Sequence, residues 1–283
     1  MESIDSFVKP GRKSLSYDSY LRVSELTNLQ TVQSSPPEHD ETLFIIIHQV
    51  YELWFKQILH ELELCCSELR RDFLIRVMHA LKRINTIQKV LLQQIDVLET
   101  MIPDDFARFR GGINPASGFQ SWQFRLVEFR MGGKEKNYLK FFAHDPKVTK
   151  ILEDALALPS LYDEFLGLLK RRGFPIPRDV LERQPSEPYI AHPSVTEVFK
   201  TVYRNPTQHS EIYLALEAML DLDEHFLLWR YRHVMMVERM IGNLSGTGGS
   251  TGAKYLRSTL DRRFFPEIWD VRNHLGTNYG GPR

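Results

Sequence analysis

Residues 212–242 read IYLALEAMLDLDEHFLLWRYRHVMMVERMIG, and this stretch decides the fold. Its apolar residues recur at helical spacing with no proline and no glycine before Gly242, which predicts one long α-helix of about 45 Å at 1.5 Å per residue. A second stretch, LFIIIHQVYELWFKQILHELE at 43–63, has the same spacing. Each stretch carries a histidine near its middle, His233 and His48.

The rest of the chain also favours helices, and we find no strand alternation and no internal repeat. We therefore expect an all-α, multi-helix bundle that forms a single domain over 1–283, with a mobile N-terminal segment (about 1–16) and a loose C-terminal tail (about 275–283). Proline, glycine and capping residues set the expected limits. We expect a short helix within 16–30, long helices at 41–70 and about 72–101, and a loop at 108–118. The next helix should be closed by Gly132–Gly133, and a helical region should start at Asp145–Pro146 and end at Gly173. An irregular stretch at 174–193 should follow, and then a helix that begins with a Ser194/Glu197 capping box.

The composition is that of an ordinary globular protein. Lys plus Arg and Asp plus Glu both number 36, so nothing indicates nucleic acid or a membrane surface as a partner. No run approaches the roughly 20 apolar residues of a membrane span, and the N-terminus lacks the apolar core of a secretory signal. The two cysteines, Cys65 and Cys66, are adjacent in a helical stretch and poorly placed to bridge each other. We expect a reduced, cytoplasmic chain.

The two histidines carry most of the functional signal. An imidazole on an apolar helix face needs a partner, because an unpaired buried polar group costs roughly 1–3 kcal/mol. Taken alone, each is more often a satisfied core residue than a ligand. Taken together on two long helices, they fit an axial ligand of haem iron, His233, and a polar group on the opposite side, His48. Phe226, Trp229, Val237 and Met240 share the face of His233 and would form an apolar wall.

Spacing argues against other metal sites. No two of the ten histidines are three or four residues apart, so the H-E-x-x-H motif is absent. No histidine follows a glutamate by three residues, which removes the di-iron signature. C-x-x-C-H is also absent, which excludes covalently attached haem. Haem b, which needs one protein ligand, remains compatible.

Two further features have a structural and a functional interpretation. Arg110 is either a solvated surface group or a bidentate clamp for a substrate carboxylate. The loop GTGGSTG (246–252) is either a helix end with a connector or a lid whose backbone N–H groups and Thr247 hydroxyl close over a polar ligand. It lacks the Lys-Ser/Thr of a P-loop and follows a helix rather than a strand.

Five strings occur in an order that resembles the tryptophan 2,3-dioxygenase family. They are SYDSYLR (16–22), ETLFIIIHQVYELWFKQI (41–58), NPASGFQSWQFR (114–125), WRYRHVMMVERMIG (229–242) and GTGGSTG (246–252), and the ending RRFFPEIWDVR (262–272) is also similar. The resemblance implies an all-helical, cytoplasmic b-type haem enzyme, usually a homotetramer. Its reaction inserts both atoms of O2 across the indole C2–C3 bond of L-tryptophan, giving N-formylkynurenine.

The resemblance also implies roles for individual residues. His233 falls at the proximal haem ligand, and His48 falls where the family's histidine hydrogen-bonds the indole N–H. Arg110 matches the carboxylate clamp, and Thr247 with its neighbour Gly246 matches the part near the substrate ammonium group and a haem propionate. The remaining matches are Phe44 and Phe106 at the indole pocket, Ser117 near the haem, and Tyr17, Tyr20 and Leu21 in a segment that enters a neighbouring subunit's site.

Three residues depart from the family's pattern near these landmarks. Asn114 stands where serine is common, Trp122 replaces a usual leucine, and Ile47 replaces a common threonine before His48. Two alternatives therefore stay open beside the dioxygenase. One is a haem monooxygenase that acts on a substituted tryptophan in secondary metabolism, and the other is a non-catalytic haem sensor.

Overall fold

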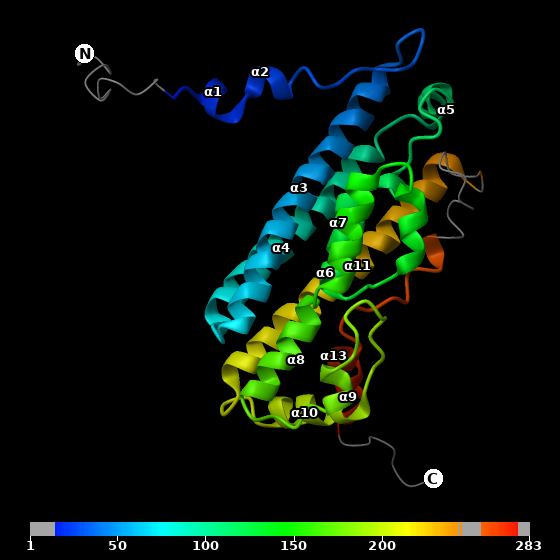
Figure 1. Ribbon diagram of the computed structural model, residues 1–283. Helices are drawn as coiled ribbons and strands as arrows, with labels where there is room; N and C mark the ends of the chain where they lie inside the picture. The colour runs from blue at the N-terminus through cyan, green and yellow to red at the C-terminus, as the bar shows by residue number, and fades with distance from the viewer. Residues whose placement is uncertain (1–14, 243, 245–255, 277–283) are drawn as a thin grey trace, which may run out of the picture.

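The computed structural model describes residues 15–242, 244 and 256–276. Three long helices organise it, α3 (His39–Arg70), α4 (Leu74–Leu98) and α11 (Ser210–Ile241) (Figure 1). No strand occurs among these described residues, so the all-α prediction is confirmed. No helix within them is both long enough and apolar enough to cross a membrane.

The other helices are shorter. They are α1 (Tyr17–Leu21), α2 (Val23–Leu26), α5 (Pro103–Arg110), η2 (Gly118–Gln120), α6 (Trp122–Met131), η3 (Lys136–Phe142), α7 (Pro146–Ala157), α8 (Leu161–Arg171), α9 (Arg178–Leu181), α10 (Pro193–Arg204), α13 (Pro266–Asp270) and η4 (Val271–His274). All of them except α1 and α2 pack on or beside this framework (Figure 1).

Most predicted helix ends are confirmed by the capping residues. Gly132 ends α6 at φ 117°, Asp145 caps α7 through its side chain, and Gly173 follows α8 at φ 88°. These glycines adopt a left-handed conformation that costs other residues energy. The predicted mobile segment (about 1–16) and tail (about 275–283) lie almost entirely outside the described residues.

Four local predictions are wrong. The stretch 174–193, expected to be irregular, contains the short helix α9. The Ser194/Glu197 capping box does not form, because the ring of His192 accepts the Ser194 N–H and the helix begins two residues earlier than expected, at Pro193. The expected loop at 108–118 is helical as far as Arg110, since α5 begins with Pro103 at its first position and ends at Arg110. The single short helix expected within 16–30 is broken at Arg22, whose φ is 55°.

The helix α4 lies antiparallel to α3. The hydroxyl of Tyr51 donates to the carbonyl of Leu91 at 2.8 Å, near one end of the pair. Further along α3, Glu61 pairs with the guanidinium of Arg83, which lies nearer the start of α4, at 2.7 Å. Residue numbers rise along one helix as they fall along the other, as a short connecting turn at 71–73 requires.

The helix α11 packs on α4 in the parallel direction. Asn85 donates to the carbonyl of Ala218 at 3.0 Å, and Gln88 donates to that of Leu222 at 3.4 Å. The first half of α3 and the second half of α11 therefore both lie at the end of the bundle where α4 stops.

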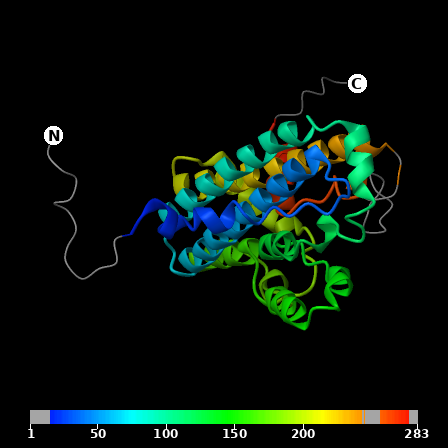
Figure 2. The ribbon, with the colours of Figure 1, turned by 90° about the horizontal axis from the view of Figure 1, so that it is seen from above.

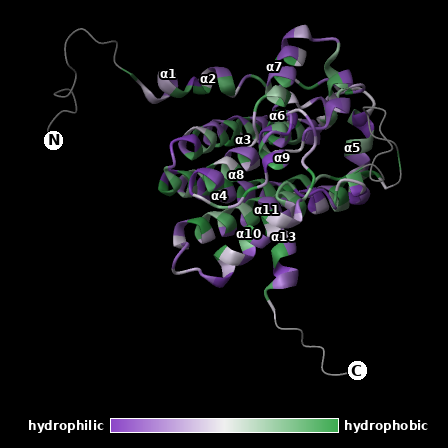
Figure 3. Ribbon diagram, turned by 60° about the horizontal axis from the view of Figure 1, so that its bottom comes forward, coloured by the Kyte–Doolittle hydropathy of each residue, from purple (hydrophilic) through white to green (hydrophobic). Residues whose placement is uncertain are grey.

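The core is one large hydrophobic cluster with a smaller one beside it. The large cluster joins α3, α4, α8, α10 and α11, and the small one joins α6, η3 and α7 around Phe129 and Phe142. Figure 3 shows hydrophobic and hydrophilic residues along the same helices, as expected where one face is buried. Burial of this apolar area is the main term that stabilises the bundle.

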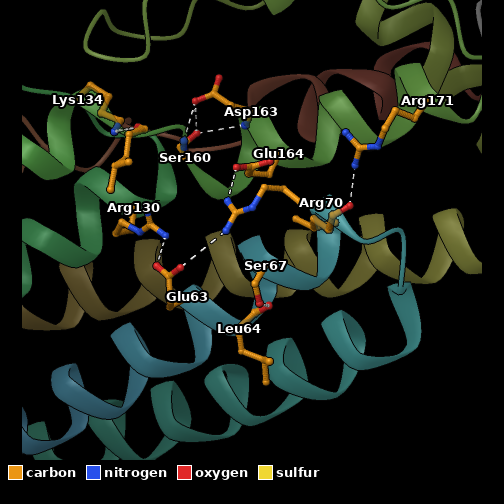
Figure 4. A network of polar contacts seen from close by, with 12 residues as sticks. Glu63, Leu64, Ser67, Arg70, Arg130, Lys134, Ser160, Asp163, Glu164 and Arg171 are labelled. Carbon is orange, nitrogen blue, oxygen red and sulfur yellow. Dashed lines mark hydrogen bonds and ion pairs between the residues drawn. The ribbon is translucent and has the colours of Figure 1, made fainter.

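Ion pairs join α3 to the helices that cover it. Arg130 of α6 bonds Glu63 of α3 at 2.6 Å, and Arg70 of α3 bonds Glu164 of α8 at 2.6 Å (Figure 4). Beside them, the buried ammonium of Lys134 donates to the carbonyls of residues 155, 156 and 158, where α7 ends. These contacts satisfy polar groups at the α6–α8 junction and fix the position of α6.

The N-terminal arm, residues 15–28, lies apart from the bundle. Its helices α1 and α2 project from the region before α3 (Figures 1 and 2). Tyr17 and Tyr20 expose 78% and 71% of their surface, and Leu21 exposes 45%. Because these large side chains are exposed, they add no hydrophobic stabilisation to the single chain.

A buried carboxylate holds the C-terminal segment on α11. Asp223 is fully buried and accepts hydrogen bonds from the backbone N–H groups of Phe264 and Phe265 and from the indole N–H of Trp269. Burial raises the pKa of this carboxyl, while the three donors and Arg230 oppose that effect. These hydrogen bonds attach the segment 264–269 to α11.

We expect Asp223→Ala to lower the free energy of unfolding by roughly 3–5 kcal/mol, because three donors lose a buried charged acceptor. Urea denaturation followed by circular dichroism measures the change. The matched control is Asp221→Ala, on the same helix but exposed. Equal loss of stability in both variants would contradict the role assigned to Asp223.

Candidate active site

A pocket opens at the end of the bundle where α4 stops. Its walls come from the first half of α3, the end of α4, α5, α6 and the second half of α11. Apolar and aromatic side chains predominate, with a few polar groups that converge on the space, as in small-molecule sites. The lining includes Phe44, His48, Tyr51, Glu52, Phe55, Leu98, Phe106, Arg110, Ser117, Phe119, Phe124, Arg125, Glu128, Tyr138, Trp229, Arg230, His233, Met236, Val237, Met240, Leu256 and Thr259.

His233 lies on α11 with its ring against a tryptophan. The ring of Trp229, one helical turn earlier, is parallel to it within 5° at a centroid distance of 5.3 Å. Burial and, to a smaller extent, the nearby His48 lower the pKa of His233 to about 4. The imidazole is therefore neutral at physiological pH, the form in which histidine binds a metal.

His48 faces the same pocket from α3. Its Nδ1 lies 2.7 Å from the carbonyl oxygen of Phe44, so Nδ1 carries the proton and donates it. Burial lowers the pKa of His48, against the raising effects of that hydrogen bond and of Glu52. The neutral ring consequently presents the lone pair of Nε2 as a hydrogen-bond acceptor.

Phe44 and Phe106 line one wall of the pocket, and Phe109 packs against both of them. Phe44 contacts Phe106 and Phe109 at centroid distances of 5.7 Å each, and Phe106 meets Phe109 edge-on at 5.2 Å. Arg110 follows in the last turn of α5 and also lines the pocket. The site thus combines an aromatic wall with a nearby guanidinium group.

Ser117 lines the pocket from the start of η2. Its hydroxyl accepts the N–H of Phe119 and so caps this short helix. The residue therefore has a structural role that coexists with its place in the wall.

A buried ionic group borders the pocket on the α6 side, and the sequence did not suggest it. Glu128 pairs with Arg125 of its own helix and with Arg230 of α11 at 3.1 Å. All three side chains are less than a tenth exposed. Two guanidinium groups share one carboxylate, so this wall carries a net positive charge. The i, i+3 spacing of Arg125 and Glu128 was the only local signal of it.

The structure brings most of the predicted site residues together. His48, His233, Phe44, Phe106, Arg110 and Ser117 all line the pocket. Tyr17, Tyr20 and Leu21 do not, because the arm that carries them projects from the bundle (Figure 1). Thr247 and Gly246 lie outside the described residues.

None of the three departures from the family pattern lines the described part of the pocket. Ile47 is buried in the main core, and Trp122 packs on the small cluster around Phe129. Asn114 is exposed and precedes Pro115 in the turn after α5. These side chains therefore lie in the hydrophobic clusters or at the surface, and none lines the cavity.

The fold and the pocket define the class of this protein: a helical bundle with a small-molecule site between two histidines, His48 of α3 and His233 of α11. Comparisons with known proteins agree with that class. The tryptophan 2,3-dioxygenase family model matches residues 2–158 and 196–275. The chain is 49% identical to a tryptophan 2,3-dioxygenase of Herpetosiphon aurantiacus, over 93% of this chain and 99% of that protein.

A second tryptophan 2,3-dioxygenase, from Myxococcus xanthus, is 45% identical over 92% of this chain and 89% of its own length. A third, from an Arthrobacter species, is 44% identical over 93% of this chain and 92% of its own length. The chain belongs to the tryptophan 2,3-dioxygenase family, and the resemblance noted in its sequence is confirmed.

The ionisation of His233 makes a prediction for the protein without added ligand. An unfolded histidine binds a proton near pH 6.5, whereas His233 in the folded state does so only near pH 4. Between these values the unfolded state holds more protons, so the free energy of unfolding should fall as the pH drops from about 6.5 toward 4. Urea denaturation at several pH values measures this slope. The His233→Gln variant should lose part of it, and an unchanged slope would contradict the assignment.

Proposed function

We propose that this chain is a haem-dependent dioxygenase that inserts both atoms of O2 across the C2–C3 bond of the indole of L-tryptophan, or of a close analogue, to give N-formylkynurenine. The observation that carries the proposal is the pair of neutral histidines, His48 and His233, on facing walls of one apolar pocket. Membership of the tryptophan 2,3-dioxygenase family supports it independently.

The residues present suit haem b. No group of three or more His, Cys, Asp or Glu able to hold a bare metal ion occurs in residues 15–242, 244 and 256–276. A cofactor that brings its own equatorial ligands needs only one imidazole, and His233 is neutral and available as that ligand. The positive wall of Arg125, Glu128 and Arg230 suits the carboxylates of haem, and the aromatic lining suits its flat ring.

Haem would supply the binding and activation of O2, which is the cofactor's own chemistry. The protein would bind and orient the substrate. We propose that Nε2 of His48 accepts the indole N–H, since Nδ1 is committed to the carbonyl of Phe44. This contact fixes which edge of the indole turns toward the iron. Phe44 and Phe106 would hold the indole between apolar faces that exclude water.

The amino-acid end of the substrate needs charged partners. The planar guanidinium of Arg110 suits a bidentate bond to the carboxylate. We propose Thr247 and Gly246 for the ammonium end, on the family resemblance alone. A full dioxygenation leaves both oxygen atoms in the product and needs no net external electrons, so only the ferrous state must be maintained.

We further propose a homotetramer in which Tyr17, Tyr20 and Leu21 complete the site of a neighbouring subunit. Their exposure on a projecting arm supports this assignment. We also propose a cytoplasmic location, for which the two buried free cysteines, Cys65 and Cys66, give support.

The activity itself is tested by mixing ferrous protein with L-tryptophan and air, without a reductant, and identifying the product by mass. We expect a gain of two oxygen atoms over many turnovers. A product with one added oxygen would favour the monooxygenase. Bound haem without any turnover would favour the sensor.

His233→Ala should lose stably bound haem, because the axial ligand is removed. The ratio of Soret absorbance to protein after gel filtration measures the loss. His225→Ala, on the same helix but outside the pocket lining, is the control. A wild-type Soret band in His233→Ala would refute the ligand assignment.

Arg110→Ala should raise the KM for tryptophan roughly 10- to 100-fold, because a charge-assisted hydrogen bond to the carboxylate is lost. Steady-state kinetics at full haem loading measures it. The control is Arg178→Ala, whose side chain is 87% exposed. A KM like that of the control would contradict the clamp.

A further inference from the structure

The first turn of α3 carries three carboxylates that each hold a different part of the chain. Glu38, Asp40 and Glu41 form this turn, which we call the acidic turn. Negative charge at a helix N-terminus is favourable in itself, but that effect needs no burial and no specific partner. The contacts of these three side chains go further.

Glu41 is the buried member of the acidic turn, with 1% of its surface exposed. One carboxylate oxygen accepts the N–H of Gln33 at 2.7 Å, and the other accepts the N–H of Ser34 at 2.9 Å. Burial raises the pKa of this carboxyl, but the hydroxyl of Ser34 and the two N–H groups outweigh it, and the pKa lies below its ordinary value. Glu41 is thus a buried charge held by the 33–34 backbone.

Residues 33–34, whose backbone Glu41 binds, lie beside the turn that follows Arg110. A methyl group on Gly112 would meet the carbonyl oxygen of Gln33 at 3.9 Å. The N–H of Gly112 in turn bonds the carbonyl of Phe109 at 2.9 Å. The backbone of Gln33 therefore lies beside Gly112, two residues after the end of α5.

The other two carboxylates hold α5 itself. Asp40 accepts the N–H of Ile102, which caps the start of α5, at 3.1 Å. Glu38 accepts the Nε of Arg108, in the last turn of α5, at 3.1 Å. The acidic turn consequently fixes both ends of the short helix that carries Phe106 and Arg110.

Besides these polar contacts, α5 is held by its aromatic side chains, since Phe106 and Phe109 pack against Phe44 of α3. It has only eight residues, exposes most of its polar face, and buries Phe109 as its one fully enclosed side chain. A helix this short is not stable by itself. Its position, and so that of the Arg110 side chain in the pocket wall, depends on tertiary contacts.

We propose that Glu41 is a positioning residue for substrate binding: by holding residues 33–34 against the 111–112 turn, it fixes the end of α5 and aims Arg110 into the pocket. This inference rests on the proposed function for its kinetic readout. Glu41 does not itself line the pocket.

The test is Glu41→Gln, which keeps the shape but places an NH2 group opposite a backbone N–H. We expect the KM for tryptophan to rise about tenfold, which corresponds to one buried donor left unpaired. We expect haem content and kcat to stay near their wild-type values. The matched control is Glu61→Gln, because Glu61 is equally buried at 1% on the same helix but bonds Arg83, away from the pocket.

Hydrogen exchange gives a second readout that does not need turnover. In Glu41→Gln, amide protection should fall in residues 31–35 and 102–113 and stay unchanged in α6. Glu61→Gln should leave both segments unchanged. If Glu41→Gln fails to fold, Asp40→Ala, at the less buried contact with Ile102, should raise KM in the same direction by a smaller factor.

The outcomes separate the two proposals. If the wild-type protein does not oxidise tryptophan, the proposed function fails, and hydrogen exchange alone decides the role of Glu41. If the wild type is active but Glu41→Gln has the KM and the exchange pattern of Glu61→Gln, the positioning role is overturned and the proposed function stands.

Discussion

The packing of α4 between α3 and α11 is the constraint on which the rest of the molecule depends. It sets α3 antiparallel and α11 parallel to α4, and so brings the first half of one and the second half of the other to the same end. α4 ends at Leu98, and the pocket lies at that level. His48 and His233 face one cavity because of this arrangement, although 184 residues lie between them in the chain.

Buried polar groups fix the elements that surround the cavity. Asp223 returns the C-terminal segment to α11, and Glu128 joins α6 to α11 through Arg230. Lys134 closes the end of α7 beside the ion pairs of Figure 4. Each group is costly to bury alone and stabilises the fold only with its partners in place. Geometry at the pocket wall therefore depends on contacts some distance from it.

Several features of the site followed from local patterns. The long helices, their histidines and most caps were predicted, since helical periodicity and capping chemistry act within a few residues. The capping box at Ser194 failed because the ring of His192, one residue before Pro193, supplies the cap instead. The helical end of α5 was missed, since Gly111 and Gly112 after it suggested a loop that begins earlier.

By itself the sequence determined the helices, the two histidines, the family and the candidate residues, because propensity, spacing and motif order are properties of the chain. Only the tertiary structure decided which of those residues share a pocket, that both imidazoles are neutral, and that Ile47 and Trp122 belong to the core. It alone revealed the Arg125–Glu128–Arg230 group and the contacts of Glu41. Ionisation and long-range pairing depend on burial and on partners distant in the chain, and these exist only once the helices have packed.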